Sequence, residues 1–175
     1  MHFSLVPHWS PTIKLDFSTL NARSEGASTN RTWSPLLTHH KTCLVLAHGF
    51  YEWDKKSGKS LTYRFVLNDR EIFAFAGLWS QWKDKFSNEV YRSFSIMTTK
   101  SNDVVGKVHY AKFRMPLILD RHEEELRLSK DISVPDLISL CDTYTDDAIS
   151  GYRVSTVVNK LHNNLPELMA PLNSL

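Results

Sequence analysis

Short runs of β-branched and aromatic residues, separated by turn sequences such as KKSGK and LNDR, fill most of the chain before residue 120. Runs of this length and composition are typical of antiparallel strands that follow one another along the sequence. They predict strands over residues 43–47, 49–53, 61–67, 71–79, 90–99 and 115–119.

The pattern changes to helical spacing after these strands. Asp120 followed three residues later by Glu123 has the form of a capping box, which predicts a helix over residues 120–128. Ser133 as an N-cap, followed by apolar residues at helical spacing, predicts a second helix within residues 133–144.

The end of the chain predicts one more strand over residues 152–158 and an irregular, Pro-interrupted segment over residues 159–172. Many strands followed by a few helices indicate the α+β class. We therefore expect a mainly antiparallel, curved sheet or barrel with a few peripheral helices, and a single domain over residues 1–175.

The composition excludes several classes of protein. With 42% hydrophobic residues and charges of both signs, the chain is neither disordered nor fibrous, and its net charge of +2 permits but does not indicate a basic groove. The longest apolar stretch, IFAFAGLW, is far shorter than a bilayer span, and no secretion signal opens the sequence. We expect a cytoplasmic protein that does not bind membranes.

Cysteine and histidine usage predicts neither a disulfide framework nor a metal site. Cys43 and Cys141 are too few and too far apart in sequence for the former, so we expect buried thiols. No group of His, Cys and Asp residues has the spacing of structural zinc ligands. A Gly-rich phosphate loop is missing as well, and we expect neither a metal nor a cofactor.

One carboxylate stands out in the segment CLVLAHGFYEW. In a strand, Phe50 and Glu52 share one face while Tyr51 and Trp53 share the other, so Glu52 lies on an apolar side. Desolvation raises the pKa of such a carboxyl and suits it to proton transfer near neutral pH. The simpler alternative is an edge strand whose glutamate reaches solvent or pairs with a lysine, Lys55 or Lys56.

Two further segments carry candidate binding groups. NARSE, residues 21–25, combines an amide, a guanidinium, a hydroxyl and a carboxylate, which together can orient a phosphate or a sugar oxygen. In VHYAKFRMPLIL, His109 is a candidate proton carrier and Arg114 a candidate phosphate ligand. The alternatives are an ordinary polar surface loop for the first segment and a capping histidine beside a solvated basic loop for the second.

Trp9, in SLVPHW near the start of the chain, also permits two interpretations. An exposed indole can stack on a nucleobase, but a tryptophan is more often part of the core.

Taken in order, these segments resemble the SOS response-associated peptidase (SRAP) family. SLVPHW resembles its Trp-Gly-Leu-Ile-Pro-x-Trp motif, NARSE its Asn-Ala-Arg-x-Glu motif, and CLVLAHGFYEW its Cys-Leu-x-Pro-Ala-x-Gly-Phe-Tyr-Glu-Trp motif. FAGLW, TTKSN, the RMP block and the closing segment YRVSTVVNKLHNNLPELMAPL are similar to further family segments. The resemblance covers most of the chain and implies a mainly β fold.

The resemblance also implies a chemistry. Family members recognise abasic sites in single-stranded DNA and trap the ring-opened sugar aldehyde as a thiazolidine through an N-terminal cysteine, with associated autopeptidase or lyase activity. Carried over to this sequence, the catalytic positions are Asn21, Glu52 and His109. Arg23 and Arg114 match positions that hold the DNA backbone.

The start of the chain departs from the family pattern. Family members begin Met-Cys-Gly-Arg and carry several dozen residues before the SLVPHW block, whereas this sequence begins MHF, so the family's nucleophile is missing. We expect that an N-terminal segment is missing because the chain is incompletely defined, or that the chain is a natural short form that binds damaged single-stranded DNA without trapping it. A small-molecule-binding barrel unrelated to DNA is a third possibility.

Overall fold

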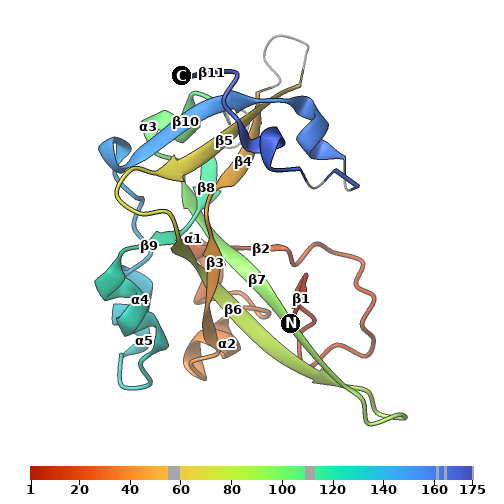
Figure 1. Ribbon diagram of the computed structural model, residues 1–175. Coiled ribbons are helices and arrows are strands. Elements are labelled where there is room, and N and C mark those ends of the chain that lie inside the picture. Colours follow the sequence, from red (N-terminus) through yellow and green to blue (C-terminus); the bar gives the residue numbers. More distant parts are fainter. Residues whose placement is uncertain (55–59, 109–112, 161, 164, 175) are drawn as a thin grey trace. The chain divides into compact units, whose positions relative to one another are not determined.

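The computed structural model describes residues 1–54, 60–108, 113–160, 162–163 and 165–174, and its elements are labelled in Figure 1. The chain divides into two compact units. The first unit comprises Met1–Leu46, Ala74–Thr99 and Pro116–Asp142. The second unit comprises Ala47–Phe73, Lys100–Met115 and Thr143–Leu175. Each unit contains most of one sheet.

The sheet of the first unit is built on a long antiparallel hairpin of β6 (Phe73–Lys83) and β7 (Val90–Lys100). β3 (Thr42–Ala47) lies beside β6. Four short strands also belong to this sheet: β1 (His2–Phe3), β2 (Asn21–Arg23), β8 (Arg114–Pro116) and β9 (Ile118–Leu119). Arg114 and Met115 of β8 are residues of the second unit. β1 and β2 pair with β7 in parallel, whereas β9 pairs with β6 antiparallel.

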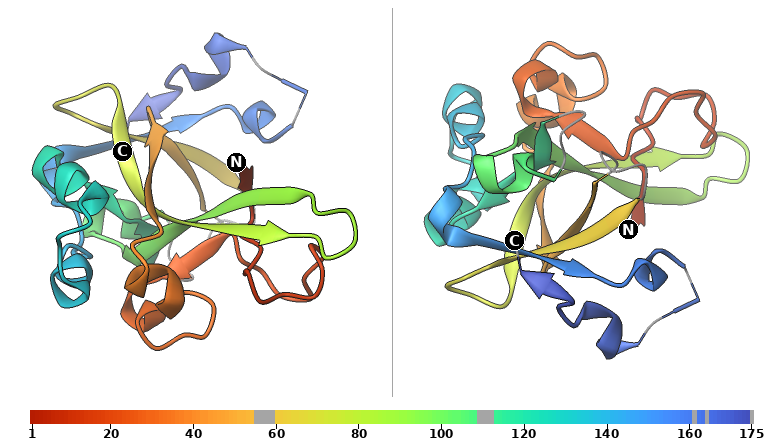
Figure 2. Two further views of the ribbon diagram at one scale, coloured as in Figure 1. Left: turned by 90° about the horizontal axis from the view of Figure 1, so that it is seen from below. Right: turned by 90° about the horizontal axis from the view of Figure 1, so that it is seen from above.

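Four helices belong to the first unit: α1 (Ser24–Ala27), α2 (Ser34–Thr38), α4 (Arg121–Leu128) and α5 (Val134–Ser139). Figures 1 and 2 show α4 and α5 side by side. The predicted capping box of α4 is present, since Asp120 Oδ1 accepts from the Glu123 N–H at 2.7 Å and Glu123 Oε2 accepts from the Asp120 N–H at 2.8 Å. Ser133 caps α5 as predicted.

The core of the first unit is formed by side chains from the sheet and the helices. Leu78 of β6, Met97 of β7 and Leu137 of α5 are almost completely buried in it. Arg127 of α4 is also fully buried, and its Nη1 donates to the Leu137 carbonyl at 3.4 Å. Burial lowers the pKa of this guanidinium.

The sheet of the second unit has four antiparallel strands in the order β11-β10-β5-β4. They are β4 (Phe50–Asp54), β5 (Leu61–Leu67), β10 (Ile149–Val154) and β11 (Asn173–Ser174). The remaining elements of this unit are short: α3 (Asp103–Gly106), η1 (Asp146–Ala148), η2 (Thr156–Asn159) and η3 (Pro166–Met169).

The α+β class is confirmed, but two details of the prediction are corrected. The described strands form open sheets instead of a closed barrel, and the pairing of β1 and β2 with β7 is parallel. The predicted strand over residues 152–158 ends at Val154, because the Ser155 hydroxyl accepts from the Val157 N–H and starts η2. The single domain stays a prediction.

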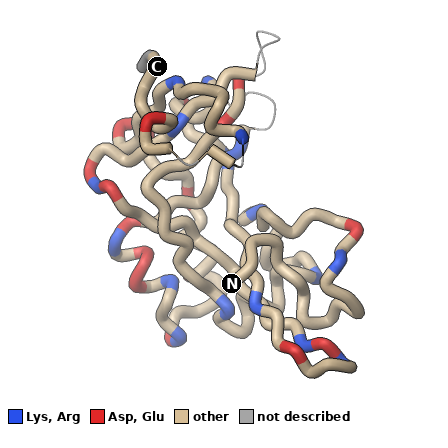
Figure 3. The backbone as a smooth tube through the Cα atoms, turned by 45° about the vertical axis from the view of Figure 1, so that its right-hand side comes forward, with Lys and Arg blue, Asp and Glu red and all other residues tan. Residues whose placement is uncertain are grey.

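Charged residues of both signs are interspersed along the backbone, as Figure 3 shows. A place where cations gather without acids is therefore a local feature and not a consequence of net charge.

Candidate functional site

Glu52 lies in the middle of β4, with Phe50 two residues before it on the same face. Phe50 stacks on Phe65 of β5 with ring centroids 5.2 Å apart, and Phe65 is fully buried. Glu52 pairs with Tyr63 in register. Burial raises the pKa of Glu52 to about 7, which confirms the rise that the strand pattern predicted.

A carboxyl with this pKa has an acid form and a carboxylate form that are both well populated near neutral pH. It can therefore donate a proton and take one back without a change of solution pH, which is the requirement for general acid–base catalysis. Lys55 and Lys56, the alternative partners considered from the sequence, lie outside the described residues.

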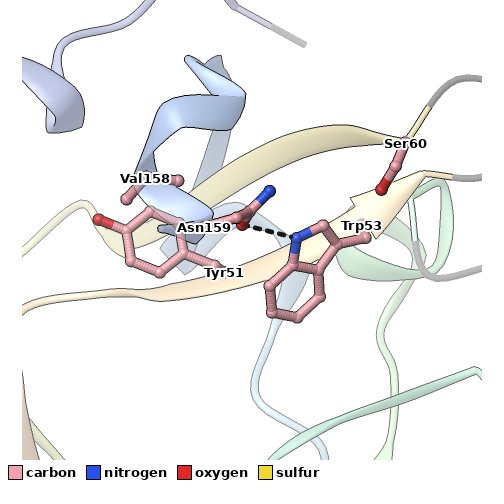
Figure 4. A pocket seen from close by; sticks show the side chains of 5 residues that line it. All are labelled: Tyr51, Trp53, Ser60, Val158 and Asn159. Carbon is pink, nitrogen blue, oxygen red and sulfur yellow. Dashed lines mark hydrogen bonds between the residues drawn. The ribbon is translucent and has the colours of Figure 1, made fainter. Parts of the chain in front are cut away.

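The opposite face of β4 lines a pocket of about 570 Å³ with Ser60, Val158 and Asn159. Figure 4 shows Tyr51 and Trp53 in this pocket, which we call the Trp53 pocket. The Trp53 indole N–H donates to Asn159 Oδ1 at 2.9 Å, and Asn159 Nδ2 donates to Thr62 Oγ1 at 3.0 Å. The Trp53 indole N–H and the Asn159 side-chain amide thus both have hydrogen-bond partners.

Arg64 of β5 is held by the turn that precedes β4. Its Nη2 donates to His48 Nδ1 and to the His48 carbonyl, both at 2.7 Å, and its Nη1 donates to the Tyr152 hydroxyl. The turn requires glycine, since Gly49 has φ 152° and an added Cβ would lie 2.8 Å from the Phe65 carbonyl oxygen. These contacts fix the backbone from which Glu52 projects.

Asn21 and Arg23 are both exposed on β2 of the first unit, on either side of the buried Ala22. Two residues apart on a strand, their side chains share one face. β2 is held by parallel pairing in which Asn21 lies opposite Ile96 of β7. An amide and a guanidinium therefore project together toward solvent from a backbone that is fixed in the sheet.

The other residues predicted from the sequence are placed as follows. Trp9 lies in the first unit, half-buried, with the Arg31 guanidinium 4.4 Å from its ring centroid. Arg114 is half-buried in β8 and belongs to the second unit, like Glu52. His109 lies outside the described residues.

Both cysteines are free, and neither has the environment of a reactive thiolate. Burial raises the pKa of Cys43 to about 11 and raises that of Cys141, although the nearby Arg127 opposes both changes. A thiol is the dominant form of both at neutral pH, and the thiolate is the nucleophile.

Across residues 1–54, 60–108 and the later described segments, no three His, Cys, Asp or Glu side chains are grouped so that they could hold a metal ion. None of the helices in the described part of the chain has the length and apolar composition needed to cross a membrane.

A family model described as SOS response associated peptidase (SRAP) matches residues 1–161. The chain belongs to this family. Relatives of the chain include the abasic site processing protein YoqW of Bacillus subtilis strain 168, which is 35% identical over 172 residues, 97% of this chain and 74% of YoqW. They also include the abasic site processing protein HMCES of Xenopus tropicalis, which is 28% identical and matches 98% of this chain and 56% of HMCES.

Solved structures share the fold. A crystal structure of a protein from Bacteroides thetaiotaomicron superposes with a TM-score of 0.87 and 26% identity, covering 97% of this chain and 74% of that one. A second, from Bordetella bronchiseptica, superposes with a TM-score of 0.77 and 25% identity, covering 87% of this chain and 75% of that one. The SRAP resemblance inferred from the motifs is confirmed.

Sequence reasoning missed the polar residues around Trp9. Arg31, Lys41 and Ser80 line one pocket with Trp9, although they come from well-separated segments of the chain. No motif links them, so only the fold identifies them as neighbours. That Tyr51 and Trp53 line one pocket, in contrast, agrees with the shared face that strand alternation predicted for them.

Proposed function

We propose that this chain recognises abasic sites in single-stranded DNA and catalyses opening of the abasic sugar ring. Two observations support the proposal. Its relatives YoqW and HMCES are named abasic site processing proteins. Glu52, in the GFYEW motif, has a pKa of about 7, and this observation carries the catalytic part.

The reaction needs one proton donated and one removed. In its acid form, Glu52 donates a proton to the ring oxygen O4′ as the C1′–O4′ bond breaks, and the C1′ hydroxyl then gives up its proton to the Glu52 carboxylate. The product is the open-chain aldehyde, an isomer of the starting sugar, and Glu52 returns to its acid form. Proton transfer of this kind typically contributes about 10²–10⁴-fold to a rate.

The remaining motif residues have supporting roles in the proposal. Asn21 orients the sugar through hydrogen bonds, and His109 assists proton transfer. Arg23 and Arg114 neutralise backbone phosphates, and Trp9 contributes a further contact to the strand. Neither Cys43 nor Cys141 is proposed as the nucleophile of a thiazolidine crosslink, because neither carries a free α-amine and burial raises the pKa of both thiols.

The test measures ring opening directly. An oligonucleotide with one abasic site is mixed with saturating methoxyamine, which captures each aldehyde as it forms, and capture is followed by mass spectrometry. We expect the wild-type chain to accelerate capture and Glu52→Gln to lose about 10²-fold or more of this acceleration while it still binds DNA. The exposed Glu71 provides the control, and Glu71→Gln should behave as wild type.

Equal rates for wild type and Glu52→Gln would overturn the catalytic part of the proposal. If Arg23→Ala and Arg114→Ala then still weakened DNA binding, the chain would be a non-covalent single-strand-binding module. The exposure of Arg23 beside Asn21 on β2 is the observation that favours this second candidate.

A further inference from the structure

The first unit contains a pocket of about 570 Å³ that none of the proposed catalytic residues lines. Its walls come from the N-terminal segment, α2 and the neighbouring strand β6, and include Trp9, Arg31, His39, Lys41, Ser80 and Gln81. We call it the Trp9 pocket.

Two buried hydrogen-bond donors of the residues that line this pocket have no partner among the described residues. Ser80 is 2% exposed, and within the described part of the chain neither its hydroxyl nor the buried Trp9 indole N–H makes a hydrogen bond. Buried polar side chains in folded proteins are almost always paired, because an unpaired one has lost its water without replacement. Two such donors in one pocket indicate a ligand with hydrogen-bond acceptors.

The charge of the pocket indicates that this ligand is an anion. The Arg31 guanidinium lies 4.4 Å from the Trp9 ring centroid, and Lys41 Nζ lies 4.3 Å from the ring centroid of Trp79. Among the described residues that line the pocket there is no aspartate or glutamate. Both cations therefore contact indole rings, and no acid is among the described residues that line the pocket with them.

We propose that the Trp9 pocket binds a phosphate group of a nucleotide. A phosphate group has several acceptor oxygens around one anionic centre. It can therefore accept hydrogen bonds from the Trp9 N–H and the Ser80 hydroxyl and bind the two cations. This inference rests on the proposed function for the source of the phosphate, which is then the backbone of the bound DNA strand outside the abasic nucleotide. A free nucleotide presents the same chemistry, so the experiment compares the two sources.

The direct probe is the indole N–H resonance of Trp9, assigned with Trp9→Phe. Inorganic phosphate, deoxyadenosine 5′-monophosphate and an unmodified single-stranded oligonucleotide are each titrated into the ¹⁵N-labelled chain. We expect this resonance to move with all three, and at the lowest phosphate concentration with the oligonucleotide. The Trp53 indole N–H, already bonded to Asn159, should stay in place.

Paired variants test the individual groups. Ser80→Ala should weaken oligonucleotide binding about tenfold. Ser93→Ala is the matched control, because Ser93 lies opposite Ser80 in register and its buried hydroxyl already accepts from the Val6 N–H at 2.8 Å. Lys41→Gln should weaken binding and flatten its salt dependence by about 0.7 in log–log slope, while Lys130→Gln, at an exposed position, should not.

The outcomes separate this inference from the proposed function. A Trp9 resonance that none of the three ligands moves, or oligonucleotide binding unchanged in both Ser80→Ala and Lys41→Gln, would overturn the phosphate pocket and leave abasic-site catalysis by Glu52 intact. If phosphate and the mononucleotide move the resonance but the oligonucleotide does not, the pocket binds free nucleotides and the DNA source is wrong. Loss of methoxyamine capture in Glu52→Gln, in turn, says nothing about this pocket.

Discussion

The Trp9 pocket and the Trp53 pocket have the same volume, about 570 Å³, and each contains a tryptophan, yet their chemistry differs. In the Trp53 pocket the indole N–H donates to Asn159, which donates in turn to the buried Thr62. In the Trp9 pocket the indole N–H has no acceptor within the described residues, and no aspartate or glutamate is among the described residues that line the pocket with Arg31 and Lys41.

Volume alone therefore does not identify a binding site. Polar groups that already satisfy one another gain little from a ligand, whereas a desolvated donor without an acceptor gains a full hydrogen bond. The same argument applies to Glu52, a desolvated acid on the face of β4 opposite Tyr51 and Trp53. Buried polar groups that reduce stability are therefore better indicators of a functional site than exposed aromatic residues are.

The largest expected effect on the free energy of unfolding comes from Glu52, on one face of β4. The pKa of Glu52 rises from 4.5 to about 7 on folding, so the folded state binds this proton more tightly than the unfolded state. Stability is therefore unaffected below about pH 4.5, falls as the pH rises to 7, and stays reduced above that. Glu52→Gln removes this penalty and should raise the free energy of unfolding at pH 8 by about 3 kcal/mol at most, measured by urea denaturation.

Glu71→Gln, at an exposed position, is the control for the loss of a negative charge. The gain in Glu52→Gln should shrink between pH 7 and pH 4.5, whereas Trp53→Phe on the opposite face should change stability equally at both pH values. If the change in unfolding free energy caused by Glu52→Gln were independent of pH, Glu52 would not be desolvated. The two faces of β4 would then not differ in their pH dependence.

Much of the fold was predictable because its signals are local. Strand β5 matches the predicted residues 61–67, and the Asp120 capping box starts α4 where the sequence predicts. The short elements were missed: β1 and β2 are held by pairing with β7, which is distant in sequence. Local composition carries no record of such long-range pairing.

The candidate site likewise has parts that local sequence predicts and parts that only the fold brings together. Glu52 and its raised pKa followed from strand alternation in GFYEW, and the motifs gave the SRAP family. The roles of Asn21, Arg23, Arg114 and Trp9 stay predictions, as does that of His109, which lies outside the described residues. The Trp9 pocket was not predictable, because Arg31, Lys41 and Ser80 become neighbours only through the packing of α2 and the sheet.

A smaller effect on the free energy of unfolding is expected from two serine hydroxyls of one sheet, of which one has a hydrogen-bond partner and the other has none in the described chain. Ser93→Ala leaves the buried Val6 N–H without an acceptor and should cost about 1–3 kcal/mol of unfolding free energy. Ser80→Ala removes a hydroxyl that has no partner in the described chain and should leave stability unchanged or slightly raised. Urea denaturation of both variants without ligand checks this order. Equal losses would mean that Ser80 is paired in solution without a ligand.

The smallest effect is expected in the Trp53 pocket itself. Asn159→Ala removes the acceptor of the Trp53 N–H and the donor to the Thr62 hydroxyl. Because Trp53 is 42% exposed, water can replace the first bond, and only the second, at a fully buried threonine, is lost, for about 1 kcal/mol. Phosphate titration should still move the Trp9 resonance as in wild type. A loss of phosphate binding in Asn159→Ala would contradict the difference between the two pockets, because Asn159 would then serve the ligand as well as Trp53.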